Sequence, residues 1–251
     1  MKSFIGSSLL AIVCTAGVGN QAHGQSVEAR QLMQATNEDR ARNGLGPLKW
    51  DPALAHAAQR HAEMMVQHGA LSHQYSGEAD LVTRVSDDGA HFREVAENLA
   101  VASTPGAVED EWMHSAPHRR NILDPHLNGI GIGLVRQGRN LWAVEDFSAG
   151  VAALGSSQIE RQIAQLLGQR GLRPAGDVSA ARQTCGMEHG SAGNLRPKFI
   201  MRWQGSDLSR LPDVLEEQIS TGRFRTAAVG ACDTGHGQPG FTTYRLAVML
   251  F

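Results

Sequence analysis

The sequence lacks the short motifs of three common enzyme classes. It contains no Gly-x-Ser-x-Gly nucleophile elbow, no Walker-type phosphate loop and no glycine fingerprint for dinucleotides. Hydrolases of the nucleophile-elbow type, P-loop nucleotide hydrolases and Rossmann dehydrogenases therefore have no support in the sequence.

Excess positive charge and long apolar runs are also missing. The chain has 23 Lys and Arg against 25 Asp and Glu, a formal net charge of −2, and no basic patch indicates nucleic acid as a partner. After residue 24, no stretch reaches the roughly 18 apolar residues of a membrane helix. We therefore expect no nucleic-acid partner and no transmembrane segment in the mature protein. No internal repeat is evident.

The first 24 residues differ in pattern from the rest. An apolar stretch of mostly small residues follows Lys2 and ends in the small-residue sequence AHG at 22–24. This pattern is typical of a bacterial secretory signal peptide, residues 1–24. A lipoprotein signal at Cys14 is disfavoured because bulky Val13 precedes the cysteine. The sequence therefore predicts a secreted or periplasmic protein.

A run of small residues at 148–157 divides the remaining chain. Residues 25–154 carry 11 basic and 17 acidic side chains, a net charge of −6, whereas residues 155–251 carry 11 and 8, a net charge of +3. We predict two domains, residues 25–150 and residues 155–251. Their opposite charges are compatible with docking of one on the other.

Hydrophobic spacing predicts three helices and a hairpin in the first domain. The helices are expected over residues 27–43, over 51–69 and from 104 to near Pro117, since proline disfavours helix in the residue before it. Alternating Gly and Ile at 129–134, a turn, and an apolar stretch at 141–147 predict two antiparallel strands.

Histidines in two of these helices have different expected roles. His61 shares an apolar stripe with Leu54, Ala58 and Met65, so we expect a buried core histidine. His114 and His118 have the i, i+4 spacing of a zinc-protease helix, but the glutamate that this motif needs after the first histidine is missing. Because proline also breaks the helix between them, we expect no such site and an exposed His114.

Several motifs in order resemble one family. "TNEDRARNGLGPLKWDPALAHAAQRHAEMM", "LSH", "AENLA", "WMHSAPHRRNIL" and "GIGIGLV" cover residues 28–148. They resemble the bacterial branch of the CAP superfamily, which comprises the cysteine-rich secretory, antigen 5 and pathogenesis-related 1 proteins. The resemblance implies an α+β fold, a CAP-type α-β-α sandwich, here followed by a smaller α+β domain. It also implies a cleft lined by two histidines and two acids.

The motifs assign the cleft residues one by one. His73 of "LSH" and His118 of "SAPHRRNIL" match the two histidines, and Glu97 of "AENLA" matches the first acid. Ser115 stands where eukaryotic members have the second acid, which places a complete site of four residues in question. Ala96 replaces the glycine that commonly precedes the glutamate.

Two chemistries are open to such a set of residues. Two neutral imidazoles and a carboxylate can hold Zn²⁺ or another divalent metal beside an open water position, which would allow hydrolysis. The same groups also make a stable hydrogen-bonded binding site. Some members of the family bind metal there, and the resemblance implies that His73 and His118 would be the ligands in this chain. The family as a whole shares no settled reaction.

We therefore expect a binding module rather than an enzyme, since the chemistry of the site and not the fold must carry a functional claim. The ligand is unknown; a small molecule, a lipid and a cell-envelope component are all open. A zinc-dependent hydrolase and a structural protein of the envelope remain the alternatives.

The second domain resembles no family that we recognise. We predict helices over residues 158–172 and 211–219 and strands over 198–203, 223–232 and 242–251. It contains Cys185 and Cys232, each followed four residues later by a histidine, His189 and His236. These four residues could form a structural zinc site. We favour a disulfide between Cys185 and Cys232, because exported proteins mature in an oxidising compartment.

Overall fold

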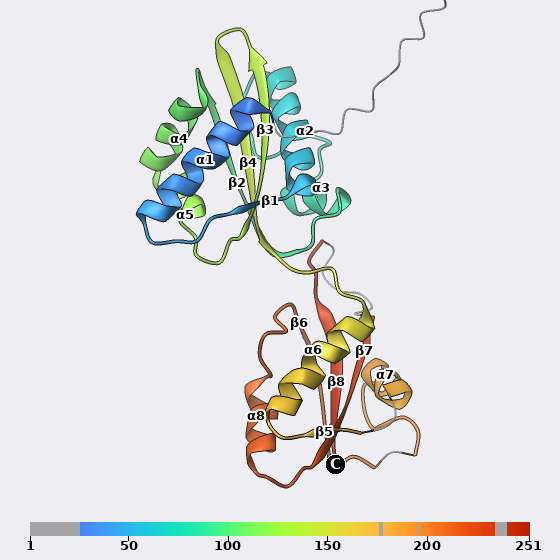
Figure 1. Ribbon diagram of the computed structural model, residues 1–251. Coiled ribbons are helices and arrows are strands. Elements are labelled where there is room, and N and C mark those ends of the chain that lie inside the picture. Colours follow the sequence, from blue (N-terminus) through green and yellow to red (C-terminus); the bar gives the residue numbers. More distant parts are fainter. Residues whose placement is uncertain (1–25, 176–177, 195, 234–239) are drawn as a thin grey trace, which may run out of the picture.

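The computed structural model describes residues 26–251 except 176–177, 195 and 234–239. The expected signal peptide and His236 lie outside the described residues. The described chain forms two four-stranded sheets, each with its own helices (Figure 1). We call residues 26–150 the first unit and residues 151–251 the second unit.

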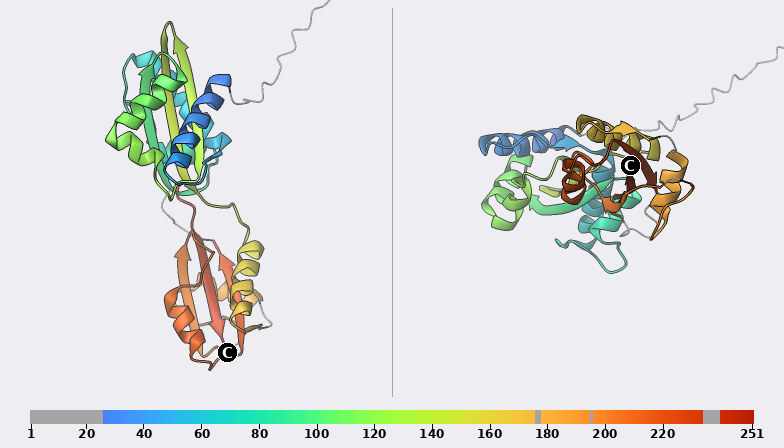
Figure 2. Two further views of the ribbon diagram at one scale, coloured as in Figure 1. Left: turned by 60° about the vertical axis from the view of Figure 1, so that its left-hand side comes forward. Right: turned by 90° about the horizontal axis from the view of Figure 1, so that it is seen from below.

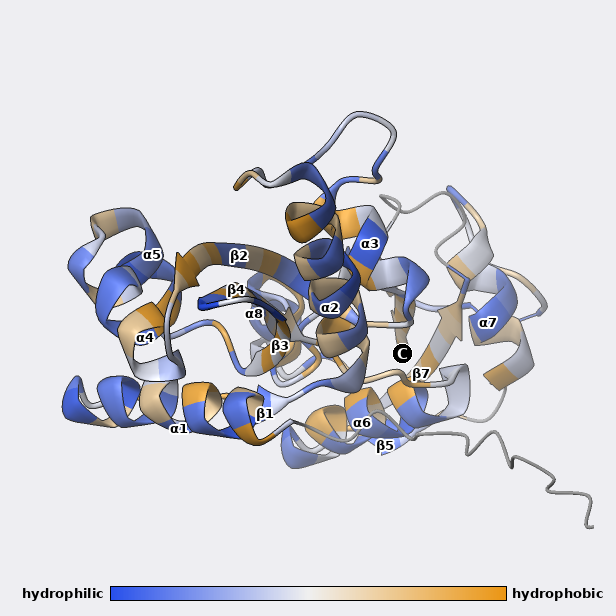
Figure 3. Cartoon of the chain, turned by 90° about the horizontal axis from the view of Figure 1, so that it is seen from above, coloured by the Kyte–Doolittle hydropathy of each residue, from blue (hydrophilic) through white to orange (hydrophobic). Residues whose placement is uncertain are grey.

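The first unit has three layers. Its elements, in chain order, are α1 (Val27–Arg42), β1 (Lys49–Trp50), α2 (Pro52–His68), α3 (Leu81–Asp87), β2 (Phe92–Ala102), α4 (Pro105–His114), α5 (Ala116–Ile122), β3 (Gly129–Gln137) and β4 (Asn140–Gly150). The sheet order is β1-β3-β4-β2. Helices α1, α4 and α5 cover one face and α2 and α3 the other (Figure 3). The predicted α-β-α sandwich is thus confirmed.

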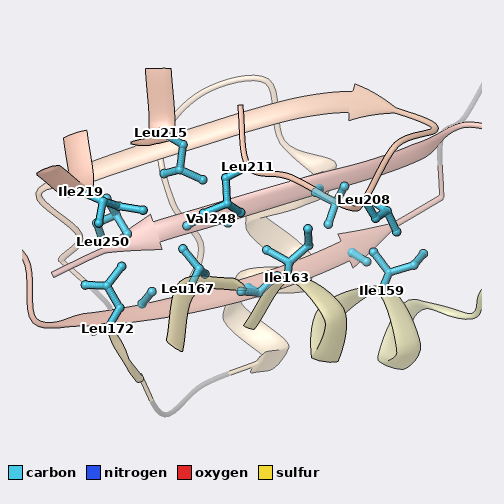
Figure 4. Packing of buried hydrophobic residues seen from close by; sticks show 14 of the residues in the cluster. Ile159, Ile163, Leu167, Leu172, Leu208, Leu211, Leu215, Ile219, Val248 and Leu250 are labelled. Atoms are coloured by element: carbon cyan, nitrogen blue, oxygen red, sulfur yellow. The ribbon is translucent and has the colours of Figure 1, made fainter. Parts of the chain in front are cut away.

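The second unit is also a sheet between helices. Its elements are α6 (Ser156–Gln169), β5 (Arg173–Pro174), α7 (Val178–Gly186), β6 (Phe199–Gly205), α8 (Asp213–Ser220), β7 (Thr226–Cys232) and β8 (Tyr244–Leu250), with the sheet order β5-β7-β8-β6. Leucine and isoleucine side chains of α6 and α8 pack against β8 in one core (Figure 4). Cys185 and Cys232 form the expected disulfide.

Local sequence explains most helix boundaries. Asp51 caps α2 by accepting a hydrogen bond from the Ala53 amide at 2.9 Å, and Gly69 ends the helix in the left-handed conformation (φ 63°). The predicted third helix is wrong in one respect: it ends at His114, and Pro117 lies in the first turn of a new helix, α5. Proline is well tolerated there because its missing N–H would have had no partner in the helix.

Two glycines of β3 let helix α2 lie directly on the sheet. A Cβ atom added at Gly131 would lie 2.1 Å from the backbone nitrogen of Ala55, and one added at Gly133 would lie 2.2 Å from the carbonyl carbon of Ala58. Backbone atoms cannot move aside as a flexible side chain would. The alternation of glycine with isoleucine therefore places small residues on the α2 face and large ones on the opposite face.

The Gly133→Ala substitution should lower the free energy of unfolding by about 2 kcal/mol, because α2 would have to move away from the sheet. Gly106→Ala is the matched control, since a Cβ atom at Gly106 meets nothing within 4 Å. Urea denaturation of both variants measures the difference. Equal stabilities of the two variants would contradict this account of the close approach.

Candidate functional site

His73 and Glu97 form the centre of the candidate site. His73 follows α2 in a loop, and its ring Nδ1 lies 2.7 Å from Oε1 of Glu97 on β2. The Glu97 carboxylate is 2% exposed, whereas the His73 side chain is 64% exposed. The hydrogen bond with Glu97 raises the pKa of His73 above its usual value. The site thus presents a solvent-accessible imidazole whose orientation is fixed by the buried Glu97 carboxylate.

Arg84 on α3 holds both residues in place. Its guanidinium donates to Oε2 of Glu97 at 2.5 Å and to the backbone carbonyl of His73 at 3.0 Å. It also lies 3.6 Å from a carboxylate oxygen of Glu78. Arg84 is 5% exposed, so a buried cation neutralises the buried Glu97. Arg84 was not predicted from the sequence, because a single arginine in a short segment has no pattern that marks it as buried.

Asp146 is a second buried acid beside Glu97. The two residues are directly opposite each other in the β2–β4 pairing, and Asp146 is fully buried. Burial, and then the negative charge of Glu97, raise the pKa of Asp146 well above its usual range. We infer that Asp146 is the neutral member of this pair of carboxyl groups at pH 7.

His61 is a buried core residue, as expected, and it stabilises the loop that carries His73. Its ring Nδ1 lies 2.6 Å from Oε1 of Glu78, and its Nε2 lies 2.8 Å from the carbonyl oxygen of Ser72. Both partners belong to the segment between α2 and α3. His61 therefore supports the site from the core without being exposed to a ligand.

His118 is placed by α5 and β2. Its ring Nδ1 is buried and has no hydrogen-bond partner among the described residues. Burial, and then the positive charge of His73, lower the pKa of His118 below its usual value. The Asn98 side chain donates to the backbone carbonyl of His118 at 3.2 Å, and the Asn121 amide donates to Asn98 at 2.9 Å. The site therefore combines one histidine that favours the charged form with one that favours the neutral form.

Among the described residues, neither Ser115 nor Glu145 forms a hydrogen bond with His73 or Glu97. Ser115 joins α4 to α5, and in the described structure its side chain makes no capping hydrogen bond. Glu145 on β4 accepts a hydrogen bond from Thr36 of α1 at 2.9 Å. It is fully buried on the side of the sheet covered by α1 and α4. His114 is exposed, as expected.

Glu97 is not free to bind a zinc or other divalent metal ion. Both Glu97 oxygens have partners, the His73 ring and the Arg84 guanidinium, and the arginine would repel a cation. Across the described residues, no group of three or more His, Cys, Asp or Glu is arranged to hold a metal. The second unit's cysteines are joined in a disulfide, so they do not supply the thiolates of a zinc site.

Two surface hollows lie away from the His73–Glu97 site. One of about 640 Å³ lies beside β1, and one of about 560 Å³ lies between the two units, near Arg93 and Tyr244. The residues that line them do not include His73, Glu97 or His118. In the part of the chain that the structure describes, no helix has the length and apolarity needed to cross a membrane.

The first unit is an α-β-α sandwich in which His73 and Glu97 are paired, as the resemblance to the CAP superfamily implies. Residues 33–147 match the CAP family, described as the cysteine-rich secretory protein family. Residues 33–147 therefore form a CAP domain, and the predicted family is confirmed for this part of the chain.

Two relatives from Bacillus subtilis (strain 168) match the same part of the chain. Uncharacterized protein YkwD is 30% identical over 118 residues, which are 47% of this chain and 46% of the relative. Uncharacterized membrane protein YlbC is 30% identical over 115 residues, 45% of this chain and 33% of the relative. The matched region thus spans less than half of either relative.

Two solved structures are similar over about half of the chain. An extracellular protein containing an SCP domain from Bacillus anthracis (strain Ames) is 28% identical, with a TM-score of 0.45, and the match covers 47% of this chain and 39% of that one. An outer surface protein from Borrelia burgdorferi is 19% identical, with a TM-score of 0.46, and the match covers 50% of this chain and 94% of that one.

Proposed function

We propose that this is an exported CAP-domain protein that acts as a binding module through the His73–Glu97–His118 site. The observation that carries the proposal is the exposed His73 ring, fixed by the buried Glu97 and Arg84. Holding a surface imidazole in one orientation costs side-chain entropy that a purely structural role would not need. Export rests on the signal-peptide pattern of residues 1–24.

The electrostatics of the site favour a ligand with an acidic or hydrogen-bond-accepting group. The raised pKa of His73 increases the fraction of its ring that carries a proton and donates. The neutral form favoured at His118 leaves a ring nitrogen that can accept. Cell-wall glycopeptides contain carboxylates beside amide and hydroxyl donors. They are the class of envelope ligand that suits both histidines.

The test uses soluble muropeptides released from purified bacterial peptidoglycan. In calorimetric titration, His73→Ala and His118→Ala should each weaken binding by about tenfold, since a hydrogen bond to a charged group contributes about 1.5–3 kcal/mol. His126→Ala, an exposed histidine outside the site, is the matched control. Equal binding by all three variants, or no binding by the wild type, would contradict the proposal. Cleavage of the muropeptides that requires His73 would favour a hydrolase instead.

A further inference from the structure

The two units share one topology. Their sheet orders, β1-β3-β4-β2 and β5-β7-β8-β6, become identical when β5, β6, β7 and β8 replace β1, β2, β3 and β4. The first and third strands pair in parallel in both sheets, and the other pairs are antiparallel. Helices α1 and α6 lie on the same side of their sheets in Figure 1, and α2 and α7 lie on the other.

The register of the strands agrees as well. In the first unit Lys49 is opposite Gly129, and in the second unit Arg173 is opposite Thr226. Each of these pairs lies four residues before a glycine of the central strand, Gly133 or Gly230.

A shared close approach supports the same alignment. A Cβ atom at Gly133 would lie 2.2 Å from the carbonyl carbon of Ala58 on α2, and one at Gly230 would lie 2.1 Å from the carbonyl carbon of Ala181 on α7. Both positions thus need a glycine for the same reason: the helix backbone lies directly on the strand. Chance similarity of two small folds would not require this agreement of register and contact.

The second unit lacks the two facing carboxyl groups of the first. In the shared register, the Glu97–Asp146 pair corresponds to Ile200 opposite Met249. Carboxyl groups in the first unit are thus replaced by apolar side chains in the second. The second unit cannot bind through the same pair of carboxyl groups, so we look for its role elsewhere.

The second unit contacts the first through the segment before β8. Phe241 packs edge-to-face on Phe92, with the ring centroids 5.4 Å apart, and joins the apolar cluster that contains Val85 of α3. The Thr242 amide donates to the Phe92 carbonyl at 2.7 Å. The two units lie end to end in Figure 2, with this segment between them.

These contacts lie against the helix that supports the site. At Gly240 an added Cβ atom would lie 2.5 Å from Cγ1 of Val82 on α3, so the segment and the helix fit closely. Val82 and Val85 flank Arg84, which holds Glu97. Helix α3 has seven residues and is too short to be stable without packing.

We propose that the second unit is a degenerate copy of the CAP fold that holds α3 through Phe241 and thereby positions Arg84 against Glu97 and His73. Phe241 is a positioning residue. The proposal rests on the proposed function in one respect: it assumes that the His73 site binds a ligand. The contacts that carry it do not depend on what that ligand is.

The test compares Phe241→Ala with Phe199→Ala in the full chain. Phe199 is a half-buried residue of the second unit that packs on its core, away from α3. In Phe241→Ala, amide hydrogen exchange of α3 should accelerate at least about tenfold, because the local opening of the helix becomes easier. The guanidinium N–H signals of Arg84, assigned by their loss in Arg84→Lys, should broaden or disappear from NMR spectra. Phe199→Ala should preserve both.

A third variant, Phe241→Leu, keeps most of the apolar volume and should largely restore both signals if Phe241→Ala is too unstable to study. Unchanged exchange in α3, or faster exchange with unchanged Arg84 signals, would overturn the proposal. Neither readout involves a ligand. A failure to bind muropeptides would therefore reject the proposed function and leave this inference standing.

Discussion

Replacing Arg84 with methionine should lower the free energy of unfolding by about 3–5 kcal/mol, the loss expected when one partner of a buried ion pair is removed. Methionine keeps much of the apolar stem, so the lost charge dominates the effect. Without the guanidinium, Glu97 would remain buried at 2% exposure, opposite the acid Asp146 and without its arginine partner.

Arg60→Met is the matched control for this prediction. Arg60 is 52% exposed, and its ion pair with Asp88 spans 2.7 Å at the surface. Surface ion pairs contribute about 0–1 kcal/mol. Urea unfolding at pH 7 should therefore separate the two variants clearly. A loss below about 1 kcal/mol for Arg84→Met would show that the Glu97–Arg84 pair does not support the fold.

Raising the pH from 5 to 9 should destabilise the protein because two carboxyl groups are buried between α1, α4 and β4. The Thr36 hydroxyl oxygen lies 2.8 Å from Oε2 of Glu109, 2.9 Å from Oε1 of Glu145 and 3.1 Å from the Leu32 carbonyl oxygen. One hydroxyl proton cannot serve three acceptors, so at least one carboxyl is protonated and donates to Thr36.

The electrostatics agree with this geometry. Burial raises the pKa of Glu109 to about 8, although Thr36 and the nearby Arg42 act in the opposite direction and Asp39 adds to the rise. Burial, and then the charge of Glu109, raise the pKa of Glu145 well above its usual value. Between about pH 4.5 and 8 the unfolded chain releases a proton that the folded chain keeps, so stability is full at low pH and falls across this range.

The size of the effect is on the order of 4 kcal/mol for Glu109, which is 4% exposed. Glu109→Gln removes the titrating group while its amide oxygen can still accept from Thr36. The variant should match the wild type near pH 5 and exceed its stability at pH 9. Glu111→Gln, an exposed glutamate of the same helix, should leave the pH profile unchanged. Parallel profiles for wild type and Glu109→Gln would refute the role of this cluster.

Short-range sequence signals predicted the elements whose boundaries depend on local chemistry. Asp51 and Gly69 mark the two ends of α2, and alternating glycine and isoleucine mark β3. Helix α3 and helix α7 were not predicted, because each is short and depends on tertiary packing. Strand β2 was not predicted either, because its polar stretch around Glu97 interrupts the apolar alternation that indicates a strand.

The site was predicted in part. His73, Glu97 and His118 came from motif resemblance, and the structure brings His73 and Glu97 into contact. Ser115 was included by its place in the motif, and it lies where α4 joins α5. Arg84 decides how Glu97 is held, yet it lies 13 residues from Glu97 in the chain. The pairing depends on the fold of α3 against β2.

The sequence by itself determined the CAP family, the helix caps, the glycine pattern of β3 and the pairing of Cys185 with Cys232 as the favoured state. Tertiary structure alone decided which acids are buried, where Arg84 lies and that the second unit repeats the topology of the first. The physical reason is that capping and alternation are local effects, whereas burial and charge pairing depend on residues far apart in the chain. A duplicated fold can therefore persist after the side chains that would reveal it in sequence have changed.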